Sequence, residues 1–394
     1  MLRGPDARLE TLATEPGSRE PHALDTPELS DQNGAKVLRD GREAFPEMLH
    51  AIAGAARSVL VEMYTFAEDS TGRRFAEALK ERARAGVRVR VLYDGVGCVE
   101  TSRSFFEDMR RAGVRAIEYH PLMPWKPLWG WFFRNHRKLL TIDGRIAFTG
   151  GLNLSDHDAP PEWGGHGWRD TEVRLEGPCA ASLEELFWAT WRKAGGESDP
   201  EPFPRPAGPQ AGRLRVRVVS STGFLKRHSI RRSYMHAIDS SKSFIGFMSA
   251  YFIPGRSVYR RLIKAAARGV RVAVIVPQET DFPWVRWASW ALFGRLLKGG
   301  VEVYEFQGRV MHAKTVVIDE LFASIGTHNL DHSSLHFNLE VAVNIFGSKF
   351  GAVMTRLFEE DLTQCRRVTF EDLKRRSFAQ KIASLVLYGF RSWL

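Results

Sequence analysis

The sequence predicts an α/β protein built from two similar halves. Short runs of Val, Leu and Ile bounded by glycine alternate with segments whose apolar residues have helical spacing, such as Phe75, Leu79 and Ala83. Strands that alternate with helices favour a sheet with helices packed on its faces. An internal repeat predicts two domains of one architecture. The matching segments are residues 58–64 with 243–249, and residues 85–91 with 268–274.

Each half is expected to run strand, helix, strand, helix, strand, and then a further strand that carries a polar motif. The third strand of each half follows a matching Gly-Val pair, at Gly113 and at Gly300. A helix closes each half, over residues 182–193 and residues 352–364.

Composition sets the expected domain boundaries. A length of 394 residues suits two domains that each bury a core. Residues 1–33 are predicted to be a disordered tail, because they hold few large apolar side chains, and residues 195–212 are rich in Pro and Gly and are predicted to be a linker. The expected domains are therefore residues 34–194 and 213–368, followed by a C-terminal amphipathic helix over residues 369–394.

A polar motif occurs once in each half, as His-x-Lys-x4-Asp. A single match would carry a false-positive risk, and a lone His-x-Lys before an apolar strand is more often a solvated strand end. Two copies with the same Gly and Asn offsets after them favour a catalytic interpretation. The first copy is His136, Lys138 and Asp143, followed by Gly150, Gly151 and Asn153; the second is His312, Lys314 and Asp319, followed by Gly326, Thr327 and Asn329.

These residue types suit chemistry at phosphorus. Residues i and i+2 of a strand share a side, so His136 and Lys138 are expected to face one space. A histidine can attack a phosphodiester or protonate its leaving group, and a lysine stabilises the negative charge that develops on phosphate oxygens. One imidazole cannot easily do both in the same step, whereas two copies can divide the roles. Asn153 and Asn329 can add neutral hydrogen-bond donors.

Charge and cysteine usage narrow the setting. A net charge of +10 and a pI near 9.6 indicate an anionic partner, which could be nucleic acid, anionic lipid or phosphate itself. Cys98, Cys179 and Cys365 show neither metal spacing nor a disulfide framework, which favours a reducing compartment. Neither an N-terminal apolar signal region nor an apolar run of transmembrane length is visible, so no spanning helix is expected.

Aromatic residues cluster in places that suit a lipid surface. One cluster precedes His136 as an insertion without a counterpart in the second half, and is expected to shield the site from water. Basic helices with Trp and Leu faces suit an anionic bilayer, although such faces are more often core. The clusters are Trp125, Trp129, Trp131, Phe132 and Phe133; Phe282, Trp284, Trp287, Trp290 and Phe293; and the C-terminal Phe378, Ile382, Leu385, Val386 and Trp393.

The sequence from about residue 34 to residue 394 resembles the bacterial cardiolipin synthases of the phospholipase D superfamily. The paired motifs are highly specific for the superfamily, and the flanking segments are moderately specific for this branch. Many members of this branch begin with two transmembrane helices, which are not visible in this sequence. In this respect the sequence resembles a shorter subclass that lacks them. The segments that carry the resemblance are residues 134–143, 149–153, 168–170, 251–254, 312–329 and 338–340, together with Asp331.

The resemblance implies two phospholipase D-like domains, each a mixed sheet flanked by helices, related by pseudo-twofold symmetry and sharing one active site. It implies a covalent phosphohistidine intermediate with no metal and no cofactor. His136 and His312 would be nucleophile and general acid, with His136 favoured as the nucleophile by analogy. Lys138, Lys314, Asn153 and Asn329 would bind phosphate, Asp170 and Glu340 would orient the histidines, and Asp143 and Asp319 would support the motifs. Thr327 stands where many members carry Ser, which keeps a hydroxyl.

The expected function is a cardiolipin synthase-like transfer of a phosphatidyl group from phosphatidylglycerol to an alcohol, with a second phosphatidylglycerol as the favoured acceptor. The expected location is peripheral, on the cytoplasmic face of the bacterial inner membrane, with an anionic phospholipid surface as partner and the oligomeric state open. The alternatives are a phospholipase D-type hydrolase, a nuclease of the same superfamily, and a membrane-binding protein that has lost catalysis. The charge fits a nuclease equally well, but the aromatic segments fit nucleic acid worse.

Overall fold

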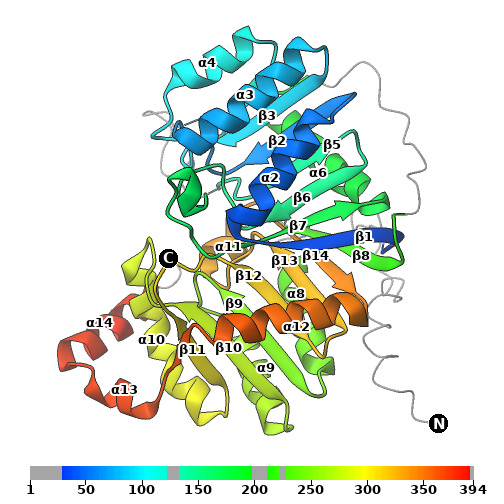
Figure 1. Cartoon of the computed structure of the whole chain (residues 1–394). Coiled ribbons are helices and arrows are strands. Elements are labelled where there is room, and N and C mark those ends of the chain that lie inside the picture. The colour runs from blue at the N-terminus through cyan, green and yellow to red at the C-terminus, as the bar shows by residue number, and fades with distance from the viewer. Residues whose placement is uncertain (1–28, 122–132, 198–210, 222–227, 391–394) are drawn as a thin grey trace. The chain divides into compact units, whose positions relative to one another are not determined.

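The structure, a computed structural model, describes residues 29–121, 133–197, 211–221 and 228–390 (Figure 1). These residues form two compact units. The N-terminal unit comprises Ser30–Val218 together with a short segment, Asn338–Val341. Among the described residues, the C-terminal unit comprises Leu29 and residues 219–221, 228–337 and 342–390.

The N-terminal unit contains a mixed sheet in the order β1-β7-β6-β5-β2-β3-β4. Strands β2, β3 and β4 are parallel, whereas β5, β6, β7 and β1 follow in antiparallel pairs. Every residue of β2 is buried, as expected for a strand covered on both faces. The strands are β1 (Ser30–Arg39), β2 (Ser58–Met63), β3 (Arg88–Asp94), β4 (Arg115–Tyr119), β5 (Leu139–Ile142), β6 (Ile146–Gly150) and β7 (Thr171–Glu176).

Helices cover both faces of this sheet. The apolar side chains of α2, α3 and α4 join the sheet in one core cluster that includes Phe45, Phe75 and Phe106, and α6 lies on the opposite face. The side chains of Asp69 and Ser102 accept hydrogen bonds from backbone N–H groups in the first turns of α3 and α4. These N-caps fix where the two helices begin. The helices are α2 (Asp40–Ala53), α3 (Ser70–Arg84), α4 (Arg103–Arg111), the 3-10 turn η1 (Pro161–Trp163) and α6 (Pro178–Lys193).

The C-terminal unit repeats the same sheet order as β14-β13-β12-β9-β10-β11, with one further strand, β15, at the edge; strand β8 next to β14 is divided between the units at Val218. Strands β9, β10 and β11 are parallel, and β12, β13 and β14 are antiparallel to their neighbours. The strands are β8 (Leu214–Ser221), β9 (Phe244–Ser249), β10 (Arg271–Pro277), β11 (Glu302–Phe306), β12 (Lys314–Ile318), β13 (Phe322–Gly326), β14 (Glu340–Phe346) and β15 (Cys365–Arg367).

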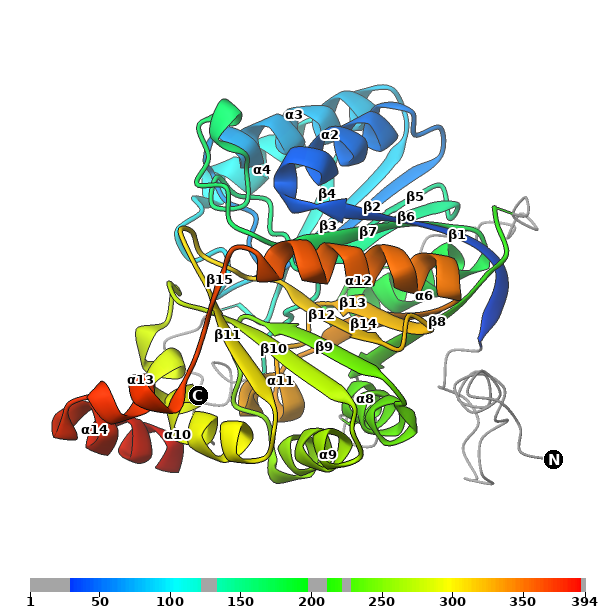
Figure 2. The ribbon, with the colours of Figure 1, turned by 60° about the horizontal axis from the view of Figure 1, so that its bottom comes forward.

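The helices of this unit also follow the N-terminal pattern. Helices α8, α9 and α10 cover one face of the sheet, and α12 covers the other (Figure 2). Two short helices, α13 and α14, follow β15 and pack against α10. The helices are α8 (Ser229–Ser240), α9 (Arg256–Ala267), α10 (Pro283–Lys298), α11 (His332–His336), α12 (Ser348–Leu362), α13 (Phe370–Arg375) and α14 (Phe378–Gly389).

The prediction of two similar α/β domains is confirmed, with differences at the boundaries. Strand β1 begins at Ser30, before the expected start at residue 34. The units divide at Val218, within β8, and not in the Pro-rich stretch before it. The expected C-terminal helix is two helices, because Thr369 and Ser377 each form a capping box that starts a new one.

Several sequence expectations fall outside the described residues. These are the disordered tail up to residue 28, the central part of the linker at 198–210, the aromatic insertion before His136 with the exception of Phe133, and the end of the C-terminal helix with Trp393. Among the residues that are described, no helix is long and apolar enough to cross a membrane.

Candidate active site

The first motif begins beside the returning segment Asn338–Val341. The backbone N–H of His136 donates to the carbonyl of Leu339 at 3.0 Å, and the N–H of Leu339 donates to the carbonyl of Arg134 at 2.9 Å. These two bonds form a parallel bridge between Asn135 and Leu339. Residues about two hundred positions apart in sequence therefore lie side by side inside the N-terminal unit.

This pairing places Glu340 against the ring of His136. Nδ1 of His136 lies 3.1 Å from each carboxylate oxygen of Glu340. Glu340 is 0% exposed and His136 is 9% exposed. A carboxylate can only accept, so Nδ1 of His136 donates in this contact. The contact thereby fixes the orientation of the ring.

Tyr64, at the end of β2, fixes the other side of the same ring. The ring centroids of Tyr64 and His136 are 4.9 Å apart at 66°, an edge-to-face contact. The Nζ of Lys138 lies 5.1 Å from the Tyr64 ring and donates to the carbonyl of His136 at 3.0 Å. The motif thus folds around one aromatic side chain, which the sequence interpretation did not single out.

The glycines after the first motif leave room for two carboxyl groups. A Cβ on Gly151 would lie 2.1 Å from Oδ1 of Asp170, and a Cβ on Gly150 would lie 2.4 Å from Oε2 of Glu172. Both distances are shorter than any real contact, so only glycine fits while the carboxyl groups keep these positions. The glycine at Gly150, which repeats in the second half as Gly326, is therefore required in the first half because the neighbouring carboxyl group leaves no room for a side chain.

Burial shifts the protonation of Glu172. Desolvation raises the pKa of Glu172 well above its ordinary value, and the nearby carboxylate of Asp170 raises it further. The ammonium of Lys138 acts in the opposite direction.

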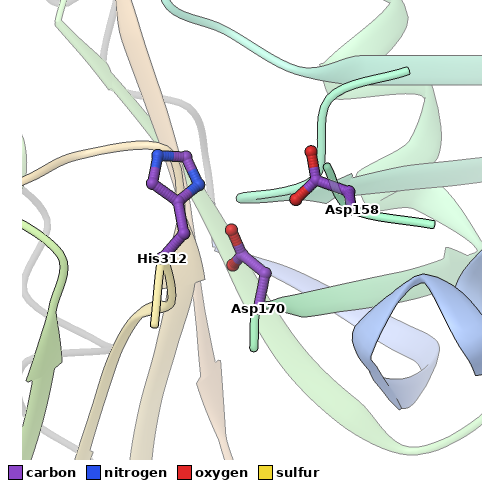
Figure 3. Close-up of side chains that lie close together, drawn as sticks. All are labelled: Asp158, Asp170 and His312. Carbon is purple, nitrogen blue, oxygen red and sulfur yellow. The ribbon is translucent and has the colours of Figure 1, made fainter. Parts of the chain in front are cut away.

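Two other buried carboxylates, Asp158 and Asp170, have oxygens within 4.8 Å of one another in the N-terminal unit (Figure 3). Asp158 accepts from the backbone N–H of Asn153 at 3.1 Å and so positions that asparagine. The metal-free reaction stays a prediction.

Arg137, the middle residue of the first motif, is completely buried and holds the returning segment in place. Its Nε donates to the carbonyl of Glu340 at 3.3 Å, and its Nη1 donates to Oγ1 of Thr190 at 2.8 Å. Its guanidinium lies 3.6 Å from the buried carboxylate of Glu62. Burial raises the pKa of Glu62, and the charge of Arg137 opposes that rise. The sequence interpretation missed this residue, because the second copy has Ala313 at the same position.

The second motif has a similar local geometry in the C-terminal unit. His312 is 5% exposed, and the Nζ of Lys314 donates back to its carbonyl, as Lys138 does for His136. The ring of Tyr251 lies 6.3 Å from that of His312 at 71°. Tyr64 precedes its bridge residue Phe66 by two positions, whereas Tyr251 precedes Phe252 by one, so the tyrosines are not equivalent in the repeat.

The two motif asparagines also resemble one another. Asn153 and Asn329 are buried, at 8% and 1% exposed. Within the described part of the chain, neither side-chain oxygen accepts a hydrogen bond. Each asparagine follows a strand of its own unit. The next residue forms a parallel bridge, Leu154 with Phe66 and Leu330 with Phe252.

The motif aspartates lie at the far end of the motif strands. Asp143 accepts from the backbone N–H groups of Ala56, Arg57 and Ser58 at 2.8–3.0 Å. Asp319 accepts in the same way from residues 242–244 at 2.6–2.8 Å. Strand β5 separates Asp143 from His136, and each aspartate ties a turn to the start of the neighbouring strand; their assignment to the catalytic residues stays a prediction.

The chain was compared with known protein families and sequences. The family model described as "Cardiolipin synthase, PLD-like domain" matches residues 48–160 and 234–362. The chain is 34% identical over 363 residues to the probable cardiolipin synthase YwiE of Bacillus subtilis, covering 90% of this chain and 71% of that protein. It is 33% identical over 355 residues to the major cardiolipin synthase ClsA of the same organism, covering 88% and 72%.

A solved structure has the same fold. The phosphatidylserine synthase of Haemophilus influenzae superposes with a TM-score of 0.68, covering 98% of this chain and 97% of that one. The sequence identity is 11%, so this likeness concerns the fold alone.

Proposed function

Because the chain belongs to the cardiolipin synthase family of phospholipase D-like phosphatidyltransferases, we propose that it moves a phosphatidyl group from phosphatidylglycerol to an alcohol. The favoured acceptor is the headgroup of a second phosphatidylglycerol, which gives cardiolipin. The observation that carries the proposal is the buried contact between Nδ1 of His136 and Glu340, because a carboxylate behind the ring orients it and can stabilise positive charge on it.

The first step forms a phosphohistidine. Nε2 of His136 attacks phosphorus, and the bond from phosphorus to the glycerol oxygen breaks. His312, in its protonated form, gives its proton to the departing glycerol oxygen. Glu340 stabilises the positive charge that develops on the His136 ring, as carboxylates do for other catalytic imidazoles.

The second step transfers the phosphatidyl group. The acceptor hydroxyl loses its proton to His312, its oxygen bonds to phosphorus, and the bond from phosphorus to Nε2 of His136 breaks. If water replaces the alcohol, the product is phosphatidic acid, which is the hydrolase alternative. Two displacements through a covalent intermediate predict ping-pong kinetics.

The remaining motif residues bind and orient in this proposal. Lys138 and Lys314 supply positive charge to the phosphate oxygens, and Asn153 and Asn329 supply amide donors. Asp170 is assigned to orient His312 as Glu340 orients His136. The protein acts from the cytoplasmic face of the bacterial inner membrane as a peripheral enzyme.

The proposal is tested with purified protein and phosphatidylglycerol vesicles, with lipids separated by chromatography. We expect cardiolipin and free glycerol in equal amounts, and a rate that a chelator leaves unchanged. His136→Gln should reduce turnover by about 10⁴-fold or more, since the covalent step is lost. His50→Gln, an exposed histidine of the same unit, is the matched control and should be fully active.

The alternatives give different outcomes in the same assay. Phosphatidic acid as the main product would identify a hydrolase, and intact lipid with cleaved nucleic acid would identify a nuclease. Quenching with an alkaline denaturant, which preserves the P–N bond, during turnover of phosphorus-labelled substrate should place the label on the peptide that contains His136. Label on the peptide that contains His312 would reverse the two histidine roles.

A further inference from the structure

Helix α14 is apolar on two sides, and only one of them is packed. Its inner residues Leu387 and Tyr388 pack with Tyr251 against a small core of Ile253, Val285 and Ala288. Its outer residues remain in solvent, with Ile382 at 44%, Leu385 at 64% and Val386 at 51% exposed. A helix that is apolar around its circumference is normally buried or inserted in an apolar medium.

The helix that supports α14 has the same character at its N-terminal end. Phe282 is 41%, Trp284 is 46% and Trp287 is 42% exposed, while Val285, Ala288 and Leu292 on the same helix are buried. Helices α10 and α14 pack side by side within the C-terminal unit (Figure 2). We call the exposed residues Phe282, Trp284, Trp287, Ile382, Leu385 and Val386 the α10–α14 surface.

Within helices α10 and α14 every charged side chain is basic, although the exposed Asp281 lies just before α10. Neither α10 nor α14 contains Asp or Glu. Arg295 and Lys298 of α10 are exposed, as are Lys381 of α14 and Arg375 before it. Aromatic and aliphatic side chains bordered by exposed bases are the composition of helices that lie in the headgroup region of an anionic bilayer.

The same charges disfavour a second copy of the chain as the occupant. A twofold dimer brings each patch against itself, so the exposed bases of one copy would face those of the other. Like charges brought together across an interface oppose association, whereas anionic headgroups neutralise them. The charge pattern therefore favours lipid over self-association.

A chain of aromatic contacts connects this surface to the second motif. The ring of Trp284 lies 5.3 Å from that of Phe282, which lies 5.7 Å from that of Tyr251. Tyr251 in turn contacts His312 at 6.3 Å and is fixed by its hydroxyl, which donates to Asp281 at 2.6 Å. Exposed aromatic side chains thus lead directly to a candidate catalytic ring.

We propose that the α10–α14 surface docks on the headgroup region of an anionic phospholipid bilayer and brings the aromatic approach to His312 to the lipid. This inference rests on the proposed function, because that function requires a lipid substrate. The vesicle-binding test, however, does not require enzymatic turnover.

The test measures sedimentation with phosphatidylglycerol-containing vesicles and with pure phosphatidylcholine vesicles. Wild type should bind the anionic vesicles at least about tenfold more tightly, because several basic side chains lie close to the membrane surface. Leu385→Glu with Val386→Glu should weaken that binding by about tenfold or more, since two apolar side chains lose their burial in lipid. Val99→Glu is the matched control, because Val99 is 65% exposed in the N-terminal unit, and it should bind as wild type.

Turnover of a short-chain phosphatidylglycerol, dissolved below its micelle concentration, separates docking from chemistry. The double variant should keep wild-type turnover on this monomeric substrate and lose turnover on vesicles. Wild-type vesicle binding by the double variant would overturn the proposal. A second outcome would also overturn it: the wild-type protein is a dimer in solution, and the double variant is a monomer that binds vesicles as well as wild type does. Vesicle binding without turnover on either substrate would refute the enzymatic proposal and leave docking intact.

Discussion

At the scale of single residues, the histidine of the first motif depends on a carboxylate that sequence position alone does not assign to it. Both Asp170 and Glu340 could be proposed as orienting groups from the motifs, but their pairing with a particular histidine could not. The pairing depends on backbone bonds between residues 134–137 and 338–341. The catalytic types were predictable because they repeat, whereas Arg137 and Tyr64 were not, because neither repeats at the equivalent position.

Replacing Glu340 with Gln should reduce kcat by about 10³-fold, because the amide can donate to Nδ1 and stabilise the wrong tautomer of His136. KM should change little, since Glu340 lies behind the ring and is 0% exposed. Steady-state kinetics on phosphatidylglycerol measure both quantities. Glu172→Gln is the comparison, because Glu172 is another buried carboxyl group of the same unit, whose pKa burial raises, and its kcat should stay within about threefold of wild type. Equal losses in the two variants would contradict the orienting role.

At the scale of secondary structure, the repeat predicted the alternation of strands and helices. It did not predict where every element begins and ends, and local sequence signals explain one of these boundaries. The expected single helix at the C-terminus ends at Arg375, since Ser377 and Gln380 form a capping box that starts α14. That Ser-x-x-Gln spacing is present in the sequence and could have been used. The start of β1 at Ser30 had no such signal, because its first residues pair with Leu214 and Val216, which are distant in sequence.

The motif aspartates also act at this scale. Asp143 has a positive φ of 55° and accepts three backbone N–H groups, so it joins the β5–β6 turn to the start of β2. Asp143→Ala should lower the free energy of unfolding by about 1–3 kcal/mol, through unpaired donors and a strained backbone. Asp143→Asn keeps one acceptor oxygen and tolerates positive φ, so its loss should be smaller. Urea unfolding gives the two values, and kcat of the folded variants should remain near that of wild type. A large loss of kcat in variants that remain folded would indicate that Asp143 takes part in the reaction.

At the scale of the whole molecule, the chain does not divide at its Pro-rich stretch. The N-terminal unit takes in Asn338–Val341, which the sequence places more than a hundred residues beyond that stretch. Composition indicates where a chain is poor in core residues, but it carries no information about a later segment that returns. The resulting unit is built from two parts of the sequence, so its stability should depend on both.

A protease site inserted between residues 200 and 208 tests this dependence. After cleavage the two pieces should elute together in gel filtration and keep turnover, because the N-terminal unit contains backbone from both pieces. The N–H of Leu339 donates to the carbonyl of Arg134 at 2.9 Å, and the N–H of His136 donates to the carbonyl of Leu339 at 3.0 Å. Leu339→Pro removes the first donor and should promote separation of the cleaved pieces, while the uncleaved variant stays one chain. If the pieces of the wild-type protein separate without denaturant, the returning segment is not what completes the N-terminal unit, and the placement of Glu340 against His136 loses its basis.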